Sequence, residues 1–292
     1  MDSARSRGRS RGQARRRLLV VALLAAVAMP SDPAEKKAEK QEAPRAPQAP
    51  ITEGDINGPR GRLHFAASGD SKKPLVLFVH GSPGSWDAFG GYLGDLDLAR
   101  QAFLVSVDRP GFGLTDAGRA EPSLAAQVAW ILPALDLAKT TKAILVGHSL
   151  GGPVIARFAM DHPDRVAGLL FLAASVDPDL EKLRWYNRLG SLRLIQRLIP
   201  LSMVISNREI VPLKRELQQM LPLWTRVTMP TIVVHGTKDS LVPYGNAAFL
   251  ARKLPHAEIR PLEGSGHMIP WQRAGEVRQA LVDLMDRVGS AP

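Results

Sequence analysis

The stretch Val146-Gly147-His148-Ser149-Leu150-Gly151-Gly152 is the most informative part of this sequence. Residues 142–146 before it are apolar and partly β-branched, which is typical of a buried strand. Residues 153–160 after it have the pattern of the start of a helix. A strand, a G-x-S-x-G turn and a helix together form a nucleophile elbow, in which a strained turn lifts a serine Oγ clear of the sheet. We therefore predict that Ser149 is a nucleophile.

The neighbours of Ser149 have the properties that such a nucleophile needs. Gly147 and Gly151 leave room where a side chain would meet the adjoining strand and helix. The helix start at Leu150 offers a free N–H to a developing oxyanion. Because G-x-S-x-G also occurs in ordinary turns, the interpretation depends on whether the rest of the chain supplies partners for the serine.

The composition is that of a globular protein whose positive charge is unevenly distributed. The 292 residues suit one large α/β domain, and 45% are hydrophobic. The formal net charge is +10, but seven arginines and one aspartate in residues 1–30 account for +6 of it. The rest of the chain therefore carries a net charge of only +4, and this small charge argues against a nucleic-acid partner. The chain has no cysteine, which excludes disulfides and a catalytic thiol.

The amino-terminal end has the pattern of an export signal. Basic residues up to Arg17 precede an apolar run of twelve residues, 18–29, which is short for a bilayer span. We predict a signal peptide or amino-terminal anchor at 1–28 and an exported, periplasmic or extracellular protein. Arg15-Arg16 also resembles a twin-arginine export signal, and a cytosolic enzyme is the alternative to export. A disordered Pro/Ala/Lys/Glu linker is expected at 29–58 and the main domain at 59–292.

Strand and helix patterns alternate through most of the main domain. This alternation predicts an α/β fold with a mostly parallel central sheet flanked by helices and joined by right-handed crossovers. Helices are expected from about residue 86, at 123–137 with Ser123 as the N-cap, and from about residue 270. The expected strands are at residues 62–67, 74–79, 102–107, 142–146, 165–174, 231–235 and 257–262.

The loops after two early strands are rich in glycine and proline. His80-Gly81-Ser82-Pro83-Gly84 allows the backbone to bend back, and we expect the N–H of Ser82 to be a second oxyanion donor beside Leu150. We interpret His80 as a buried structural histidine in preference to a catalytic base. Asp108 and Arg109, after the next strand, are expected to be structural and to pair with loop backbone.

The alternation stops after Asp177, and residues 178–223 are helical but irregular. Prolines at 200, 212 and 222 are expected to divide this segment into short helices that form a small cap over the site. The cap has eight Lys/Arg against four acids. A basic, apolar cap could rest on anionic lipid, although a solvated helix face is the simpler interpretation.

Two later loops carry the residues that would complete a triad. Asp239 follows the strand at 231–235, and His267 follows Gly264-Ser265-Gly266 after the strand at 257–262. The order Ser149, Asp239, His267 is that of nucleophile, acid and base in α/β-hydrolases. Asp177 is the alternative acid.

The sequence resembles the α/β-hydrolase superfamily from about residue 60 to 288. The resemblance is carried by HGSPG at 80–84, DRPGFG at 108–113, GHSLGG at 147–152, GTKDSLVP at 236–243 and GSGH at 264–267. It implies a serine hydrolase in which His267 accepts the proton of Ser149, Asp239 orients His267, and the N–H groups of Ser82 and Leu150 bind the oxyanion. No cofactor and no metal is expected.

The resemblance leaves the substrate open. Haloalkane dehalogenases and epoxide hydrolases of this superfamily have aspartate where Ser149 stands, so those activities are not expected. A small to medium carboxylic ester is our first prediction, because a cap of about 45 residues is short. The alternatives are a carbon–carbon hydrolase, a cofactor-free perhydrolase, an amidase, an acyltransferase and a non-catalytic ligand-binding homologue. Contact with a membrane through the amino terminus or the cap is a further expectation.

Overall fold

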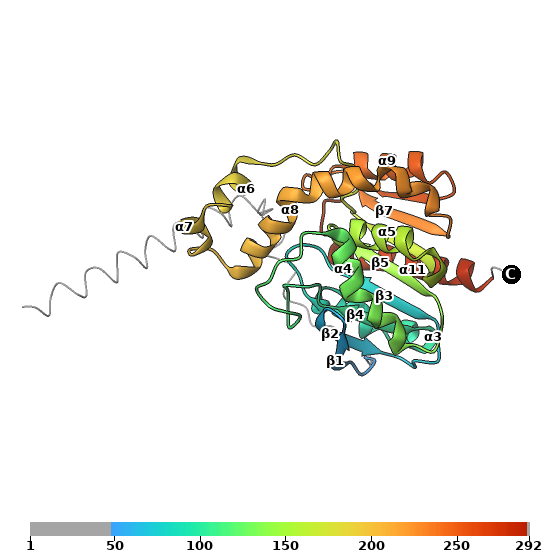
Figure 1. Ribbon diagram of the computed structural model, residues 1–292. Helices are drawn as coiled ribbons and strands as arrows, with labels where there is room; N and C mark the ends of the chain where they lie inside the picture. The colour runs from blue at the N-terminus through green and yellow to red at the C-terminus, as the bar shows by residue number, and fades with distance from the viewer. Residues whose placement is uncertain (1–47, 291–292) are drawn as a thin grey trace, which may run out of the picture.

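An eight-stranded sheet forms the centre of the molecule (Figure 1). The computed structural model describes residues 48–290, and the predicted signal segment 1–28 lies outside them. The strand order is β1-β2-β4-β3-β5-β6-β7-β8, with β2 antiparallel to its neighbours β1 and β4 and all other neighbours parallel. The strands are β1 (Thr52–Gly58), β2 (Gly61–Ser68), β3 (Leu75–Val79), β4 (Phe103–Val107), β5 (Ala143–His148), β6 (Val166–Leu172), β7 (Thr231–Gly236) and β8 (Glu258–Leu262). The predicted α/β fold with a mostly parallel sheet is confirmed.

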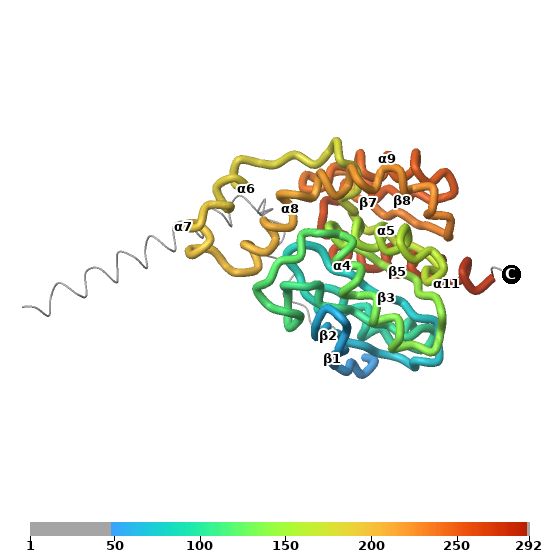
Figure 2. The backbone as a smooth tube through the Cα atoms, viewed as in Figure 1, coloured from blue at the N-terminus to red at the C-terminus, as the bar shows by residue number. Residues whose placement is uncertain are grey.

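Helices cover both faces of this sheet, as the backbone tube in Figure 2 also shows. One apolar core lies under α4 (Leu124–Ile131), α5 (Gly151–Asp161) and α9 (Gly245–Lys253), and the other under α2 (Gly90–Leu93), α3 (Leu96–Gln101) and α11 (Ala274–Gly289). The remaining helices are α6 (Trp185–Gly190), α7 (Arg193–Gln196), α8 (Leu201–Met220), α10 (Ile269–Gln272) and the short 3-10 helices η2 (Trp86–Phe89), η3 (Leu132–Leu137), η4 (Pro163–Arg165) and η5 (Leu221–Arg226). Between residues 48 and 290, no helix is both long and apolar enough to cross a membrane.

The first strand corrects the predicted boundary of the linker. β1 lies within the segment 29–58 that was expected to be disordered, and it pairs with β2 from Thr52↔Ala67 to Gly58↔Gly61. Its sequence, TEGDING, contains one large apolar residue, and most of its side chains are exposed. The strand is held by backbone hydrogen bonds to β2, which no apolar periodicity can reveal. The domain therefore begins before residue 59.

The cap differs from its prediction at one proline. Pro200 and Pro222 do lie at the two ends of α8, but Pro212 lies inside this helix of 20 residues. Proline removes one N–H, which leaves the carbonyl of Arg208 without its helical donor. Arg208 is on the exposed side of α8, where water can satisfy that carbonyl. The opposite side packs Val204, Ile205, Leu213 and Leu217 into the interior, so burial of this face keeps the helix continuous.

A buried ion pair joins the cap to the loop after β4. Arg109 is 0% exposed and Glu209 of α8 is 2% exposed. The Arg109 Nη1 and Nη2 atoms donate to Oε1 and Oε2 of Glu209 at 2.9 and 3.1 Å. Gln127 of α4 accepts from the guanidinium at 2.7 Å and donates to Glu209 at 3.1 Å. Because both charges are hydrogen-bonded, α8 is held in one place above the sheet.

Removing the carboxylate of this pair should unfold the domain far more easily. Glu209→Ala strands a buried guanidinium, which typically costs about 3–5 kcal/mol. Asp97→Ala is the control, because it removes the exposed Arg100–Asp97 pair, typically worth below about 1 kcal/mol. Urea denaturation of the two variants would measure the difference. Equal losses would show that the Arg109–Glu209 pair does not hold the cap.

The elbow glycine Gly151 should tolerate no side chain. A Cβ built there would lie 2.1 Å from the carbonyl oxygen of Val79 in β3, so strand or helix must shift. We expect Gly151→Ala to lower the free energy of unfolding by roughly 1–3 kcal/mol. A Cβ at Gly275 in α11 would meet no atom within 4 Å, and Gly275→Ala should leave stability unchanged or raise it by up to about 1 kcal/mol. Thermal denaturation of the two alanine variants compares them directly.

Candidate active site

Ser149 lies on the turn between β5 and α5 with a positive φ of 54°. Such a backbone conformation is strained for a residue with a side chain and typically costs about 1–3 kcal/mol. The turn is held by the N–H of Ser149, which donates to the carbonyl of Leu172 at 2.9 Å. Gly147 makes the turn possible, since a Cβ there would lie 2.5 Å from the carbonyl oxygen of Gly151. Ser149 itself remains partly exposed, so its hydroxyl is accessible.

Asp239 and His267 meet at the carboxyl ends of β7 and β8. Nδ1 of His267 lies 2.7 Å from Oδ2 of Asp239, whose side chain is fully buried. The other oxygen, Oδ1, accepts from the N–H groups of Leu241 and Val242 at 2.9 and 2.8 Å. Burial raises the pKa of Asp239, but hydrogen bonding from His235, His267 and Val242 outweighs burial and holds the pKa well below its usual range. The carboxylate is therefore ionised at neutral pH and orients the imidazole of His267.

Asp177, the alternative acid, is engaged elsewhere. Its Oδ1 accepts from the N–H of Asp179 at 2.9 Å, and its Oδ2 lies 3.9 Å from Arg252. Asn246 holds the same turn by accepting from the N–H groups of Val176 and Asp177. This geometry assigns Asp177 to its own loop, and Asp239 is the carboxylate that His267 contacts.

His148, which the sequence reasoning did not single out, packs against His267. The two imidazole rings lie 4.8 Å apart, and Nε2 of His148 donates to the carbonyl of His267 at 3.2 Å. Burial, and then the charge of His267, lower the pKa of His148 to about 3, so the ring is neutral. Trp271 closes the other side of His148 with an edge contact at 5.3 Å. Since His148 directly precedes Ser149, this contact brings the His267 loop to the elbow.

The loop after β3 also reaches the elbow, because β3 and β5 are paired neighbours. A Cβ at Gly81 would lie 3.0 Å from Cβ of Ser149, so the backbone of this loop passes directly beside the serine. Within residues 48–290, the N–H groups of Ser82 and Leu150 donate to no backbone or side-chain acceptor. Both predicted oxyanion donors thus flank Ser149 with their N–H groups available.

Arg109 controls how this loop is oriented. Its Nε and Nη2 atoms donate to the carbonyls of His80 and Gly81, both at 2.9 Å. In a trans peptide the C=O and the next N–H point in opposite directions. Turning the Gly81 carbonyl toward the guanidinium therefore turns the N–H of Ser82 away from it. The Ser82 hydroxyl donates to Glu209 at 2.9 Å, so the cap helix fixes the same residue from the other side.

His80 and Asp108 have structural contacts. The Nδ1–H of His80 donates to the carbonyl of Gly81 at 2.7 Å, and Nε2 accepts from the N–H of Arg109 at 3.0 Å. Burial, and then Arg109, lower the pKa of His80 well below its usual range. Asp108 accepts from the N–H groups of Trp86 and Leu114 at 2.7 and 2.8 Å. Asp108 and Arg109 thus pair with loop backbone, as predicted.

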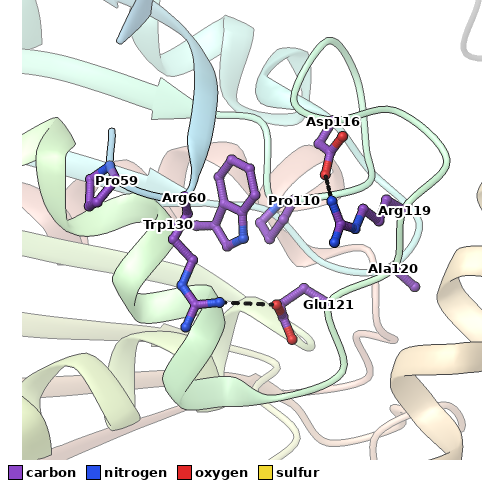
Figure 3. Close-up of a pocket in the computed structure, with 8 residues that line it drawn as sticks. All are labelled: Pro59, Arg60, Pro110, Asp116, Arg119, Ala120, Glu121 and Trp130. Atoms are coloured by element: carbon purple, nitrogen blue, oxygen red, sulfur yellow. Dashed lines mark ion pairs between the residues drawn. The ribbon is translucent and has the colours of Figure 1, made fainter. Parts of the chain in front are cut away.

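A separate hollow lies away from the triad (Figure 3). Its volume is about 320 Å³, and the ion pairs Arg60–Glu121 and Asp116–Arg119, both at 3.9 Å, lie along its wall. Pro59, Pro110, Ala120 and Trp130 complete the lining. Across residues 48–290, no group of three or more His, Cys, Asp or Glu side chains is arranged to hold a metal ion.

The sequence matches known proteins over most of the described chain. Residues 74–192 match the family model described as alpha/beta hydrolase fold. The dihydrolipoyllysine-residue acetyltransferase component of the acetoin cleaving system of Pseudomonas putida is 27% identical over 76% of this chain, which spans 65% of that protein. A 2-hydroxy-6-oxononadienedioate/2-hydroxy-6-oxononatrienedioate hydrolase of Paraburkholderia phymatum is 25% identical over 77% of this chain and 91% of its own length.

Other matches are shorter or structural. Epoxide hydrolase B of Mycobacterium tuberculosis is 33% identical over 113 residues, which cover 37% of this chain and 32% of that protein. The structure of a putative aryl esterase from Burkholderia cenocepacia has the same fold, with a TM-score of 0.63, 21% identity and coverage of 82% of this chain and 100% of the other. The sheet order, the elbow at Ser149 and these matches together show that the chain has the α/β-hydrolase fold.

Proposed function

We propose that this protein is a serine hydrolase that cleaves small to medium carboxylic esters through an acyl-enzyme on Ser149. The observation that carries the proposal is the convergence of three loops on one edge of the sheet. A strained, accessible serine lies beside the backbone of Gly81, and the paired Asp239–His267 loops reach it through His148. The short cap supports a substrate of limited size.

Each group has a defined part in the proposed reaction. His267 accepts the proton of Ser149 as its Oγ attacks the acyl carbon, and then returns it to the leaving alcohol. Asp239 stabilises the imidazolium through the hydrogen bond at 2.7 Å. The N–H groups of Ser82 and Leu150 bind the oxyanion, where losing one donor typically costs roughly 100- to 1000-fold in rate. Water then releases the acid by the same steps.

Hydrolysis of a carbon–carbon bond is the second candidate. The relative from Paraburkholderia phymatum is named for that class of substrate and matches along 91% of its length. The same triad and oxyanion donors would act on a ketone carbon, with a carbon leaving group in place of an alcohol. Epoxide hydrolysis is less well supported, because Ser149 occupies the position where we expect aspartate in such enzymes and the match is short.

The first test is hydrolysis of p-nitrophenyl esters of increasing acyl length. The wild type should turn over short and medium esters, and Ser149→Ala should lose at least roughly 1000-fold in kcat/KM because no nucleophile remains. Ser290→Ala, a hydroxyl deletion at the end of α11, is the matched control and should keep full activity.

Three outcomes would overturn the ester proposal. Preference for long-chain lipid over short esters would contradict the substrate size. The wild type could instead consume a 2-hydroxy-6-oxo-2,4-dienoate, measured by the loss of its absorbance, and turn over no ester. If that activity depended on Ser149, carbon–carbon cleavage would replace the ester proposal. Absence of any covalent organophosphonate adduct on Ser149 by mass spectrometry would favour a non-catalytic protein.

Substitution should distinguish the two candidate triad acids, Asp239 and Asp177, by their effect on kcat. Asp239→Asn keeps the shape of the side chain but removes the charge facing His267, and we expect kcat to fall by roughly 1,000- to 10,000-fold. Because the pKa of Asp239 is held below its usual range, the wild-type carboxylate stays charged between about pH 6 and pH 9, and its own titration adds no pH dependence to the loss. Asp177→Asn should change kcat by only a few-fold. A larger loss in Asp177→Asn would assign the acid to that loop.

A further inference from the structure

The outer part of the cap exposes an unusual concentration of large apolar side chains. We call residues 182–208, which comprise α6, α7 and the start of α8, the cap tip, and it projects beyond the edge of the sheet in Figures 1 and 2. Six of the twelve exposed large apolar residues within 48–290 lie in residues 182–201 alone. They are between 37% and 69% exposed: Leu183, Trp185, Leu189, Leu192, Leu194 and Leu201.

The same segment carries positive charge alone. It contains no Asp or Glu and six basic residues, namely Lys182, Arg184, Arg188, Arg193, Arg197 and Arg208. All six are exposed, and none forms an ion pair with an acid elsewhere in residues 48–290. Of the acids that border the segment, Glu209 faces inward and bonds to Arg109, whereas Glu181 bonds to Ser175 and is partly exposed. Between residues 182 and 208 the surface is therefore apolar and cationic.

The combination of exposed apolar and basic side chains distinguishes between water, a second copy of the chain and a lipid bilayer as the surroundings of the cap tip. A solvated helix face would place its leucines inside and its charges outside, whereas here both are outside. A second copy of the chain would bring six like charges against six, which is unfavourable. An anionic bilayer satisfies both features, because its headgroups attract Lys and Arg while its interface accommodates Trp and Leu.

We propose that the cap tip docks on the surface of an anionic lipid bilayer. A groove of about 530 Å³ extends this surface, and its lining has four basic residues and one acid, Glu181, beside Leu183 and Ile210. Because α8 contacts Ser82 through Glu209, docking places the catalytic edge of the sheet next to the bilayer. The proposal concerns where the protein sits and holds whichever bond is cleaved.

Co-sedimentation of the full chain with lipid vesicles tests the role of the charge. Wild-type protein should bind vesicles of phosphatidylcholine with about one-third phosphatidylglycerol, and weakly bind phosphatidylcholine alone. The triple variant Arg188→Gln, Arg193→Gln and Arg197→Gln should lower the partition coefficient by roughly 10- to 100-fold, since each basic residue contributes to the attraction. High salt should reduce wild-type binding to a similar level.

A charge-matched control separates the cap from the arginines near the amino terminus. Lys72→Gln, Lys139→Gln and Lys142→Gln remove three exposed charges that precede β3 and β5, at the opposite edge of the sheet. This control should bind as the wild type does. All variants keep the amino-terminal arginines, so equal binding by the cap variant, the control and the wild type would overturn the proposal. Unchanged turnover of a soluble ester would show that the variants are folded.

Fluorescence tests whether the apolar residues enter the interface. Brominated phosphatidylcholine within the same anionic vesicles should quench the tryptophan emission of the wild type, and Trp185→Phe should lose most of that quenching. Quenching that is unchanged in Trp185→Phe would contradict insertion of the cap tip. Concentration-dependent dimers that Trp185→Ser with Leu194→Ser disperses would show instead that this face is an interface between copies.

Discussion

The geometry of the catalytic edge depends on the buried pair of Arg109 and Glu209. One guanidinium contacts the carbonyls of His80 and Gly81, the side chain of Gln127 and the cap carboxylate. It thereby joins three segments whose contact residues lie 18, 28 and 100 residues from Arg109 in sequence: α4, the loop after β3 and α8. The contact with the Gly81 carbonyl fixes the peptide that carries the Ser82 N–H. The same guanidinium therefore holds both the loop after β3 and the cap.

A purely apolar contact could hold the cap as firmly but could not orient this peptide. Buried ion pairs are frequently no more stabilising than hydrophobic residues of similar size. Leucine or methionine at 109 would pack against α8, yet it would offer no donor to the Gly81 carbonyl. That carbonyl would keep only the hydrogen bond from Nδ1 of His80, so the peptide that carries the Ser82 N–H would be held less firmly. The pair is thus better understood as a device of orientation than as a source of stability, although removing one half alone is costly because the other charge stays buried.

The parts of the molecule that follow from local rules could be predicted from the sequence. The strand, turn and helix around Ser149 are determined by neighbouring residues, and close contacts at Gly147 and Gly151 show why glycine is needed there. Apolar runs located β3 to β8 within a few residues for the same reason.

β1 escaped prediction because its pairing with β2 uses backbone atoms. Glu209 and the fold of the cap escaped because their partners are distant in sequence, and Pro212 because burial of one helix face outweighs a lost hydrogen bond. His148 was visible within the elbow itself, but its contact with His267 arises only when β5 and the loop after β8 meet.

The two sides of the cap have opposite electrostatic character. On the inner side, carboxylates are the useful groups, since Glu209 meets a guanidinium and Glu216 accepts from the N–H of Leu124. On the outer side, only cations occur between residues 182 and 208. A cap with acids outside would lose attraction to an anionic surface, and a cap with cations inside would repel Arg109. The helix α8 carries inward-facing carboxylates and an exposed arginine. A substitution on one side of the cap therefore acts on the other side through the same helix.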